Sequence, residues 1–401
     1  MEKGGFLERY GLTRVINVSG TMTSLGASRV VPEAIKAGAE IQSHFVLIDE
    51  LQAKASEVIA RMTGAEAGFV AACSAAGMSQ SISGCMTGTN LNRIESLPHT
   101  DGLPNEVLVQ AGHLINYGAP ISQAINLTGA CIVPLGTAAL VNFYHLEDCI
   151  SDQTAAALFV VSHHVVQEGQ IALEEFISIC KQRSVPVIVD MASEYDLRSP
   201  IELGADVVIY SSHKFLGGPT GGIVAGSKKL VRAAYLQNKG ICRHIKIGKE
   251  GIAGTIAALE AWELRDHQSV FDSEQRYVNY WRKVLYNVDG LSLDVRHDWT
   301  GNPIVRLKIS VNPDKAGLFA WELADRLSAG EPSIQVRDDL VEHGYFFLDP
   351  CNLIAGEEVV VAKRIANEVN QARDRGDGRR YSLAERRRRC IESLLKWPDV
   401  S

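Results

Sequence analysis

Short apolar runs alternate with amphipathic stretches between about residue 66 and residue 226 of the chain. Segments between the runs, such as ALEEFISICKQRS (172–184), have helical periodicity. The apolar runs lack the alternation of a half-exposed strand, which indicates strands buried on both faces. They are AGFVAAC (67–73), EVLVQAG (106–112), ACIVPLG (130–136), AALFVVSHH (156–164), VPVIVDMAS (185–193) and ADVVIYSSH (205–213). Repeated strand–helix–strand units predict an α/β fold with a mostly parallel, doubly wound sheet.

Polar residues follow the ends of several of these predicted strands. They are Ser74, His113, Ser162–His163, Asp190 and the run from Ser211 to Lys214. A single polar residue at a strand end usually belongs to an ordinary loop. However, ligands of doubly wound sheets bind beyond the carboxyl ends of the strands. The convergence of several such residues on one edge therefore indicates a site.

The pattern changes after residue 266. The segments LSLDVRHD, IVRLKIS and SIQVRDD alternate like half-exposed antiparallel strands, and amphipathic helices separate them. We therefore expect an N-terminal arm (1–30), a large α/β domain (31–266), a smaller α+β domain (267–372) and a basic helical tail (373–401).

The tail contains a predicted last helix. Ser382 and Glu385 have the spacing of a capping box at its start. Arg386 to Arg389 would surround this helix, and we interpret them as solvent-exposed or as subunit contacts rather than as a nucleic-acid site.

Composition excludes several classes of protein. The 401 residues are 46% hydrophobic and 22% charged, as in an ordinary globular protein. No apolar run reaches the roughly 20 residues of a membrane span, and the N-terminus does not resemble a secretory signal. The eight cysteines are scattered singly, which predicts reduced thiols in the cytoplasm without a metal site. The net charge of −7 argues against a general nucleic-acid binder.

One lysine has an unusual setting. Lys214 follows a buried strand and precedes the glycine-rich run GGPTGG. A pyridoxal phosphate (PLP) site needs a Schiff-base lysine, a carboxylate for the pyridine nitrogen and backbone N–H groups for the phosphate. Lys214, Asp190 and the helix start in CSAAGMSQS (73–81) supply these groups, and the glycines would leave room for the flat cofactor. Each feature alone has an ordinary structural explanation, but their order is specific.

The segments around these residues resemble the fold-type I PLP-dependent enzymes. The similarity is greatest to the branch containing bacterial selenocysteine synthase and D-glucosaminate-6-phosphate ammonia-lyase. It rests on VIVDMAS and ADVVIYSSHKFLGGPTGGIVAG, and also on RVINVSGTMTSLGAS (14–28), VLVQAGHLINYGAP (107–120), GICRHIKIGKEGIAG (240–254) and GEPSIQVR (330–337).

The resemblance implies roles for individual residues. Lys214 would be the Schiff-base lysine and Asp190 the partner of the pyridinium. The phosphate would be held by Ser74, Ala75, Ala76 and Gly77, assisted by Ser211 and His213. His113 would stack on the ring, unless it is a buried loop histidine. Ser162, His163 and Gln167 would approach either the 3-hydroxyl of the cofactor or the substrate. Arg337 would bind the substrate carboxylate, and the cations Arg243, Lys246 and Lys249 would bind an anionic tail or a neighbour's phosphate. Arg337 and the three cations have surface solvation as their alternative.

The resemblance favours a lyase that removes the Cα proton of a hydroxylated or phosphorylated amino acid, eliminates the β-substituent and releases ammonia. Racemisation and aldol cleavage are alternatives, as is a non-catalytic B6-binding protein. A transferase acting on charged tRNA is a further alternative. We consider it less favoured because the chain is acidic and starts almost directly with RVINVSG. The resemblance also implies at least a homodimer with shared active sites.

Overall fold

The computed structural model describes residues 5–376, 378 and 380–399, and their contacts form two compact units. The larger unit spans Gly26–Arg265. The smaller unit combines the residues up to Leu25 with those from Asp266 onward. The N-terminal segment, the region 267–372 and the tail thus fall within one unit.

The larger unit contains a seven-stranded sheet in the order β2-β8-β7-β6-β5-β3-β4. Its strands are β2 (Ala67–Ala71), β3 (Glu106–Gln110), β4 (Cys131–Leu135), β5 (Thr154–Val160), β6 (Val187–Asp190), β7 (Val207–Ser211) and β8 (Gly222–Gly226). The six apolar runs all form strands, which confirms the prediction of a mostly parallel sheet. The seventh strand, β8, is the apolar run after Lys214 and lies antiparallel to both β2 and β7.

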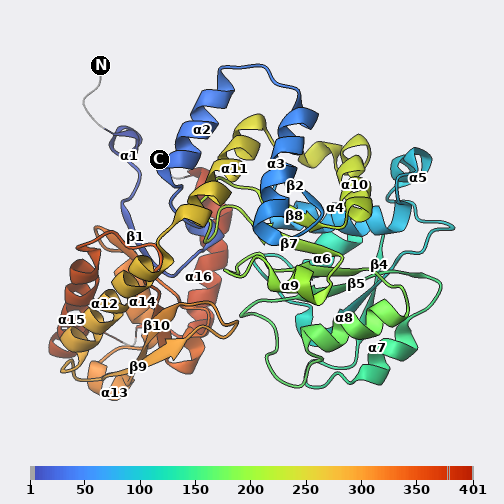
Figure 1. Cartoon of the computed structure of the whole chain (residues 1–401). Coiled ribbons are helices and arrows are strands. Elements are labelled where there is room, and N and C mark those ends of the chain that lie inside the picture. Colours follow the sequence, from blue (N-terminus) through green and yellow to red (C-terminus); the bar gives the residue numbers. More distant parts are fainter. Residues whose placement is uncertain (1–4, 377, 379, 400–401) are drawn as a thin grey trace. The chain divides into compact units, whose positions relative to one another are not determined.

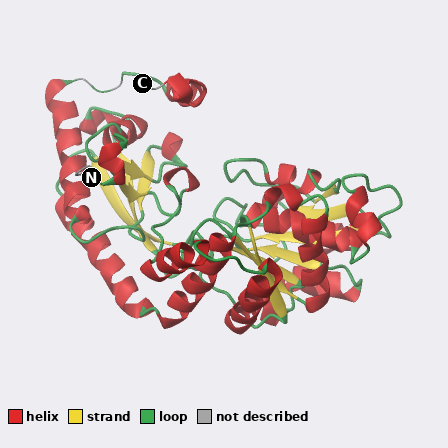
Figure 2. Cartoon of the chain, turned by 90° about the horizontal axis from the view of Figure 1, so that it is seen from above, coloured by secondary structure: helices red, strands yellow, loops and turns green. Residues whose placement is uncertain are grey.

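Helices cover both faces of this sheet (Figures 1 and 2). The helices of this unit are α2 (Pro32–Gln42), α3 (Ile48–Thr63), α4 (Ser74–Thr87), α5 (Leu91–Ser96), α6 (Ile121–Asn126), α7 (Phe143–Cys149), α8 (Leu173–Gln182), α9 (Ser199–Leu203), α10 (Lys228–Leu236) and α11 (Lys249–Leu264), and its short 3-10 turns are η2 (Ala111–His113), η3 (Gln237–Lys239) and η4 (Arg243–Ile245). One core contains residues of α3, α7, α8 and α11, and a second contains residues of α4, α5, α6 and α10. Consecutive residues of β5 point into different cores: Phe159 lies in the core with α3, and Leu158 lies in the core with α4. The sheet is therefore covered on both faces and doubly wound.

The smaller unit contains a three-stranded antiparallel sheet, β12-β10-β9, and a parallel pair, β1–β11. Its strands are β1 (Val15–Val18), β9 (Leu291–His297), β10 (Val305–Val311), β11 (Ser333–Val336) and β12 (Tyr345–Leu348). Its helices are α1 (Phe6–Arg9), α12 (His267–Leu285), α13 (Pro313–Ala316), α14 (Ala320–Ser328), α15 (Glu357–Arg375) and α16 (Leu383–Lys396), with short turns η1 (Thr23–Leu25), η5 (Val341–His343) and η6 (Trp397–Asp399).

The prediction of an antiparallel strand in SIQVRDD was wrong in its direction. Strand β11 pairs in parallel with β1, so that Val15 lies opposite Ser333 and Val18 opposite Val336. Alternating burial is common to parallel and antiparallel strands on a half-exposed surface. The parallel pairing of β11 with β1, near the other end of the chain, therefore could not be inferred from the alternation of buried and exposed residues.

The C-terminal helix α16 begins with the predicted capping box, in which the Ser382 hydroxyl accepts from the amide of Glu385. Arg386 of this helix contacts Asp325 at 2.8 Å and also Asp338. The guanidinium of Arg389 lies 4.4 Å from the centre of the Tyr381 ring. The arginine run is therefore attached in part to its own unit. Among the described helices, none combines the length and apolar character needed to span a membrane.

Candidate functional site

The strand register places Asp190 and Ser211, and the strand ends that precede Ser74 and Ser162, along one edge of the sheet. The ends of β2 and β7 and the start of β8 lie side by side, as do positions near the ends of β5, β6 and β7. The aligned residues are Ala71, Gly222 and Ser211 in the first row, and Val160, Asp190 and Ile209 in the second. The expected convergence of strand ends is thus confirmed.

Lys214 lies in a tight loop between β7 and β8. The Gly218 amide donates to Ser212 O at 2.8 Å, and the Gly217 amide donates to Lys214 O at 3.0 Å. The loop is also attached to the segment before α2, because the Val31 amide donates to Gly217 O at 2.8 Å. These bonds hold the lysine backbone while its side chain is only half-buried.

The glycines after Lys214 do not border open space, contrary to the expectation that they make room for the cofactor. A Cβ on Gly218 would lie 2.1 Å from the Ser212 hydroxyl oxygen, and a Cβ on Gly222 would lie 2.2 Å from Cys73 O. Gly217 also needs its positive φ of 65° for the turn. The glycines therefore allow the loop to fold against protein atoms.

Asp190 ends β6 with its side chain buried. Burial raises the pKa of its carboxyl group to about 6, although the charge of Lys214 and the amide of Ala192 act to lower it. That amide donates to Asp190 Oδ1 at 3.2 Å. An ionised carboxylate in this position lacks full compensation, so it would be stabilised by an incoming cationic ligand.

His113 is 2% exposed and touches the edge of the Phe159 ring, with centroids 4.6 Å apart. Its Nδ1 accepts from the Val160 amide at 3.1 Å, and its Nε2 lies 3.4 Å from Gln110 Nε2. Burial lowers the pKa of His113 to about 4, so the ring is neutral near pH 7.

Helix α4 begins directly after β2, as expected, with Cys73 as its N-cap. The Gly77 amide donates to Cys73 O at 3.0 Å, and the Ala76 amide donates to Cys73 Sγ at 3.4 Å. The first two amides, of Ser74 and Ala75, have no hydrogen-bond acceptor among the described residues. These N–H groups can bind an anion at the helix N-terminus.

The remaining predicted residues of the larger unit differ in their surroundings. Ser211 Oγ lies 3.0 Å from His213 Nδ1, and burial together with the charge of Lys214 lowers the pKa of His213. His163 is half-buried. Gln167 is exposed, and its side-chain amide donates to the backbone of its own loop, at Ser162 O and at Val165 O.

The three candidate cations after η3, Arg243, Lys246 and Lys249, differ in their contacts. Lys249 Nζ donates to Gln42 O at 3.1 Å and to His44 O, so it caps the end of α2. Arg243 and Lys246 are exposed and make no ion pair with the described residues. Of the three, Lys249 has carbonyl acceptors for its ammonium group, whereas Arg243 and Lys246 have neither an ion pair nor a side-chain hydrogen bond within the described part of the chain.

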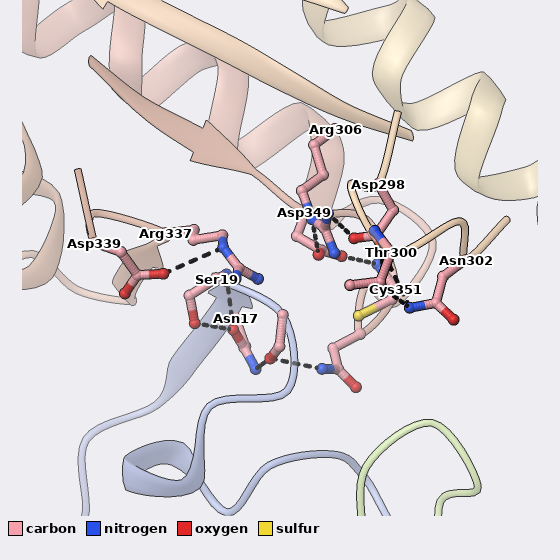
Figure 3. A network of polar contacts seen from close by, with 12 residues as sticks. Asn17, Ser19, Asp298, Thr300, Asn302, Arg306, Arg337, Asp339, Asp349 and Cys351 are labelled. Carbon is pink, nitrogen blue, oxygen red and sulfur yellow. Dashed lines mark hydrogen bonds and ion pairs between the residues drawn. The ribbon is translucent and has the colours of Figure 1, made fainter. Parts of the chain in front are cut away.

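Arg337 belongs to the smaller unit, directly after β11, where it joins a polar network (Figure 3). Its Nε lies 3.3 Å from Asp339 Oδ2, and its side chain is 11% exposed. Burial and the charge of Arg306 lower its pKa. The alternative interpretation of Arg337, as a solvated surface residue, is therefore wrong, because its side chain is largely buried.

Sequence reasoning missed two residues. Arg306 pairs with Asp298 and Asp349, and an arginine in a strand interior could have indicated a buried ion pair. Tyr117 has a raised pKa because of burial and the charges of Asp190 and Cys73, which associates it with the edge of the sheet near Lys214. Its place in NYGAP was the available signal.

The donors of the larger unit fit PLP. Two unsatisfied helix amides suit a phosphate, a buried carboxylate suits a pyridinium nitrogen, and a lysine lies close enough to influence the pKa of that carboxylate. The sheet and this set of groups define a fold-type I PLP-dependent enzyme. An aspartate aminotransferase from Thermus thermophilus, at 14% identity and a TM-score of 0.54 over 90% of this chain and 93% of that chain, shares the fold.

The family model "SelA: L-seryl-tRNA selenium transferase" matches residues 15–271, and the chain belongs to this family. It is 36% identical over 367 residues to D-glucosaminate-6-phosphate ammonia lyase of Salmonella typhimurium (strain 14028s / SGSC 2262), covering 92% of this chain and 98% of that protein. A solved structure of D-glucosaminate-6-phosphate ammonia-lyase superimposes with a TM-score of 0.83 at 35% identity, covering 92% of this chain and 100% of that one. The chain is also 34% identical over 360 residues to a 5'-C-glycyluridine monooxygenase-decarboxylase of Streptomyces sp, covering 89% of this chain and 90% of that protein.

Proposed function

We propose that the protein is a PLP-dependent ammonia-lyase that acts on a phosphorylated amino-sugar acid. The observation that carries the proposal is the similarity to the ammonia-lyase over nearly the full length of both chains. The local chemistry supports it, because a lysine, a buried carboxylate and open helix amides lie at one edge of the sheet.

Individual residues of the larger unit would hold the cofactor. Lys214 Nζ binds its aldehyde and Asp190 its pyridine nitrogen. The amides of Ser74 and Ala75 bind the phosphate, and Ser211 and His213 complete this end of the pocket. Ala76 and Gly77 contribute chiefly a compact helix start, since their amides already have acceptors.

His113 would lie beside the cofactor ring. It remains neutral, and because Nδ1 accepts from the Val160 amide, we assign its proton to Nε2. A neutral ring places no second positive charge beside the pyridinium that Asp190 stabilises.

The bound cofactor withdraws electrons from Cα of the amino acid and so makes its proton acidic. Lys214 Nζ takes that proton as the general base. The hydroxyl at C3 then leaves as water, which is regained on hydrolysis, and the products are a 2-oxo-3-deoxy acid and ammonia. His213, which is half-buried and whose pKa is lowered by burial and by Lys214, is neutral beside the base.

Other residues would bind the substrate. Arg337 takes the carboxylate, because a guanidinium can donate two parallel hydrogen bonds to it. Arg243, exposed and unpaired among the described residues, suits the phosphate of the substrate. His163 and Gln167 would lie near the substrate. The side chain of Gln167 would contribute by holding its loop in place through hydrogen bonds to the loop backbone.

The test is a substrate screen. Purified enzyme should bind PLP, and borohydride should fix the cofactor to the peptide containing Lys214 but not in the Lys214→Ala variant. Incubation with D-glucosaminate 6-phosphate should release ammonia and a 2-oxo acid in equal amounts. Formation of product without ammonia would contradict the proposal.

A second candidate is favoured by the similarity to the monooxygenase-decarboxylase, which is nearly as great. That chemistry consumes O₂ and releases CO₂. An oxygen electrode and a CO₂ assay with 5'-C-glycyluridine distinguish it from the lyase in the same preparation. Tight, salt-sensitive binding of charged tRNA would instead support a transferase.

We also propose a cytoplasmic homodimer with shared active sites. All eight cysteines are free, as expected in a reducing compartment. The turn between α2 and α3 exposes Phe45 fully, and Leu47 and Ile48 in part, which suits an interface with a second copy. Light scattering should show a dimer that Phe45→Asp weakens.

A further inference from the structure

Arg306 is the centre of the polar network in the smaller unit (Figure 3). Its Nε lies 2.6 Å from Asp349 Oδ2, and its Nη1 contacts Asp298 Oδ1. The side chain of Arg306 is 11% exposed, and those of the two aspartates are 4% and 1% exposed. Arg306 therefore contacts two buried carboxylates at once and shares its single positive charge between them.

The remaining oxygens of these carboxylates have partners as well. Asp298 Oδ2 accepts from the Thr300 hydroxyl at 2.6 Å and from Asn302 Nδ2 at 3.1 Å, and Asp349 Oδ1 accepts from the Cys351 amide at 3.0 Å. Although burial acts to raise the pKa of Asp298 and of Asp349, Arg306 and these hydrogen bonds hold both below the ordinary value. Both carboxylates are thus ionised at neutral pH.

Arg337 lies beside Asp349 but has a different ion-pair partner. A Cβ on Gly20 would lie 3.0 Å from Asp349 Oδ2 and 3.5 Å from Arg337 Nη1, so both groups border the space left by this glycine. The ion pair of Arg337 is with Asp339, through Nε, and the Asp339 side chain is 30% exposed. Asp349 is therefore the buried carboxylate placed to capture Arg337 if Arg306 were lost.

We propose that Arg306 is a positioning residue that keeps the guanidinium of Arg337 available for the carboxylate of the substrate. The inference rests on the proposed function, which assigns that ligand to Arg337. By binding Asp298 and Asp349, Arg306 prevents Asp349 from occupying the N–H groups that a bidentate contact with the substrate requires. Arg306 acts through Arg337 and does not itself contact the substrate.

The experiment compares two ligands by isothermal titration calorimetry with the PLP-loaded enzyme. One is 6-phospho-D-gluconate, which carries a hydroxyl group in place of the amino group. The other is D-glucitol 6-phosphate, which also lacks the carboxylate. The wild type should prefer the first by at least about tenfold, the effect of one charge-assisted contact. Arg306→Met and Arg337→Met should each lose this preference, while the visible absorption of bound PLP is unchanged.

A second substitution separates positioning from a merely structural role. In Arg306→Met combined with Asp349→Asn, the competing carboxylate is gone and the preference should return to near the wild-type value. A structural role predicts no recovery. Arg306→Lys should recover only part of the preference, because one ammonium cannot reproduce contacts from two sides of a guanidinium. Arg296→Met is the matched control, since Arg296 lies opposite Arg306 in the ladder but is exposed.

The outcomes are distinct. Retained preference in Arg306→Met, or no recovery in the double variant, overturns the inference while the proposed function stands. If Arg306→Met does not fold, Asp349→Asn alone decides, and it should keep the preference; its loss in the folded variant overturns the inference. A wild type that binds neither ligand and releases no ammonia from D-glucosaminate 6-phosphate refutes the proposed function and the inference together.

Discussion

Asp190 and Asp349 are two buried carboxylates with the same local geometry, but their pKa values are shifted in opposite directions. Asp190 ends β6 and Asp349 follows β12, and each accepts a hydrogen bond from the amide two residues later. The pKa of Asp190 is raised to about 6 by burial, which the charge of Lys214 offsets only in part. The pKa of Asp349 is lowered despite burial, because Arg306 lies 2.6 Å away.

The difference distinguishes a carboxylate that completes a protein network from one that is kept for a ligand. The network of the smaller unit supplies its own countercharge, so its groups are held in place by one another. The edge of the sheet in the larger unit leaves Asp190 undercompensated, and a cationic ring nitrogen would supply the missing charge. Burial alone therefore does not identify a functional carboxylate.

The largest expected loss of activity follows from replacing Lys214, the lysine whose charge lowers the pKa of Asp190. Lys214→Ala should reduce ammonia release by about 10³-fold or more, because it removes both the general base and the covalent attachment of the cofactor. Steady-state assays and borohydride labelling measure the two losses. Lys229→Ala, at an exposed lysine of the same unit, is the control and should remain within about twofold of the wild type.

The comparison itself is tested by the same substitution at both aspartates. Asp190→Asn should weaken PLP binding by about 10- to 100-fold, the effect of one charge-assisted hydrogen bond, without lowering the stability of the PLP-free protein. Asp349→Asn should destabilise the smaller unit by about 3 kcal/mol, because Arg306 loses one of its two buried partners. Cofactor titration and calorimetric unfolding measure these effects. If both variants lost stability alike, the distinction between the two carboxylates would be wrong.

Two glycines, Gly222 at the start of β8 in the larger unit and Gly20 next to Asp349 in the smaller unit, should also differ. Gly222→Ala places a Cβ 2.2 Å from Cys73 O. Because backbone atoms would have to shift to remove this clash, the substitution should lower the unfolding free energy by about 3 kcal/mol. Gly20→Ala places a Cβ 3.0 Å from Asp349 Oδ2 at a φ of 92°, which should cost about 1–2 kcal/mol. Gly38→Ala in α2 is the control, because its Cβ would lie 3.4 Å from Glu250 O and the helix favours alanine. Denaturant unfolding ranks the three variants.

The pH dependence should reflect the raised pKa of Asp190. Because the folded, PLP-free protein holds this proton more tightly than the unfolded chain, the contribution of Asp190 to stability decreases as the pH rises through about 6. A bound pyridinium requires the carboxylate, so PLP affinity should instead increase over the same range. Titrations between pH 5 and 8 measure the affinity, and the increase should be absent in Asp190→Asn.

The smallest effect is expected at an exposed pair in the smaller unit. Arg296 Nη2 lies 2.6 Å from Asp294 Oδ2, and both side chains are about half exposed. Arg296→Met should change the unfolding free energy by less than about 1 kcal/mol, because solvent screens such pairs. A loss comparable to that of Asp349→Asn would show that burial is not what strengthens the Arg306 contacts.

Much of the fold followed from the residue pattern, because strands buried on both faces must be apolar throughout. Six strands were predicted in this way, and the helix start at Ser74 and the capping box at Ser382 were predicted from local residue types. The direction of β11 was not, since its partner β1 lies more than 300 residues away and alternation does not encode direction. The packing role of Gly218 and Gly222 was missed because a sequence does not show which atoms surround a glycine.

The sequence by itself determined the kind of sheet, the edge at which polar groups gather, and the order of a small-residue helix start, Asp190 and Lys214. These features are local or periodic, so each is encoded by neighbouring residues. Only the tertiary structure decided that Asp190 is undercompensated while Asp349 is paired, and that Arg306 lies between Asp298 and Asp349. Such properties depend on how closely charges from distant segments approach within a low-dielectric interior, and distance between segments is set by folding alone.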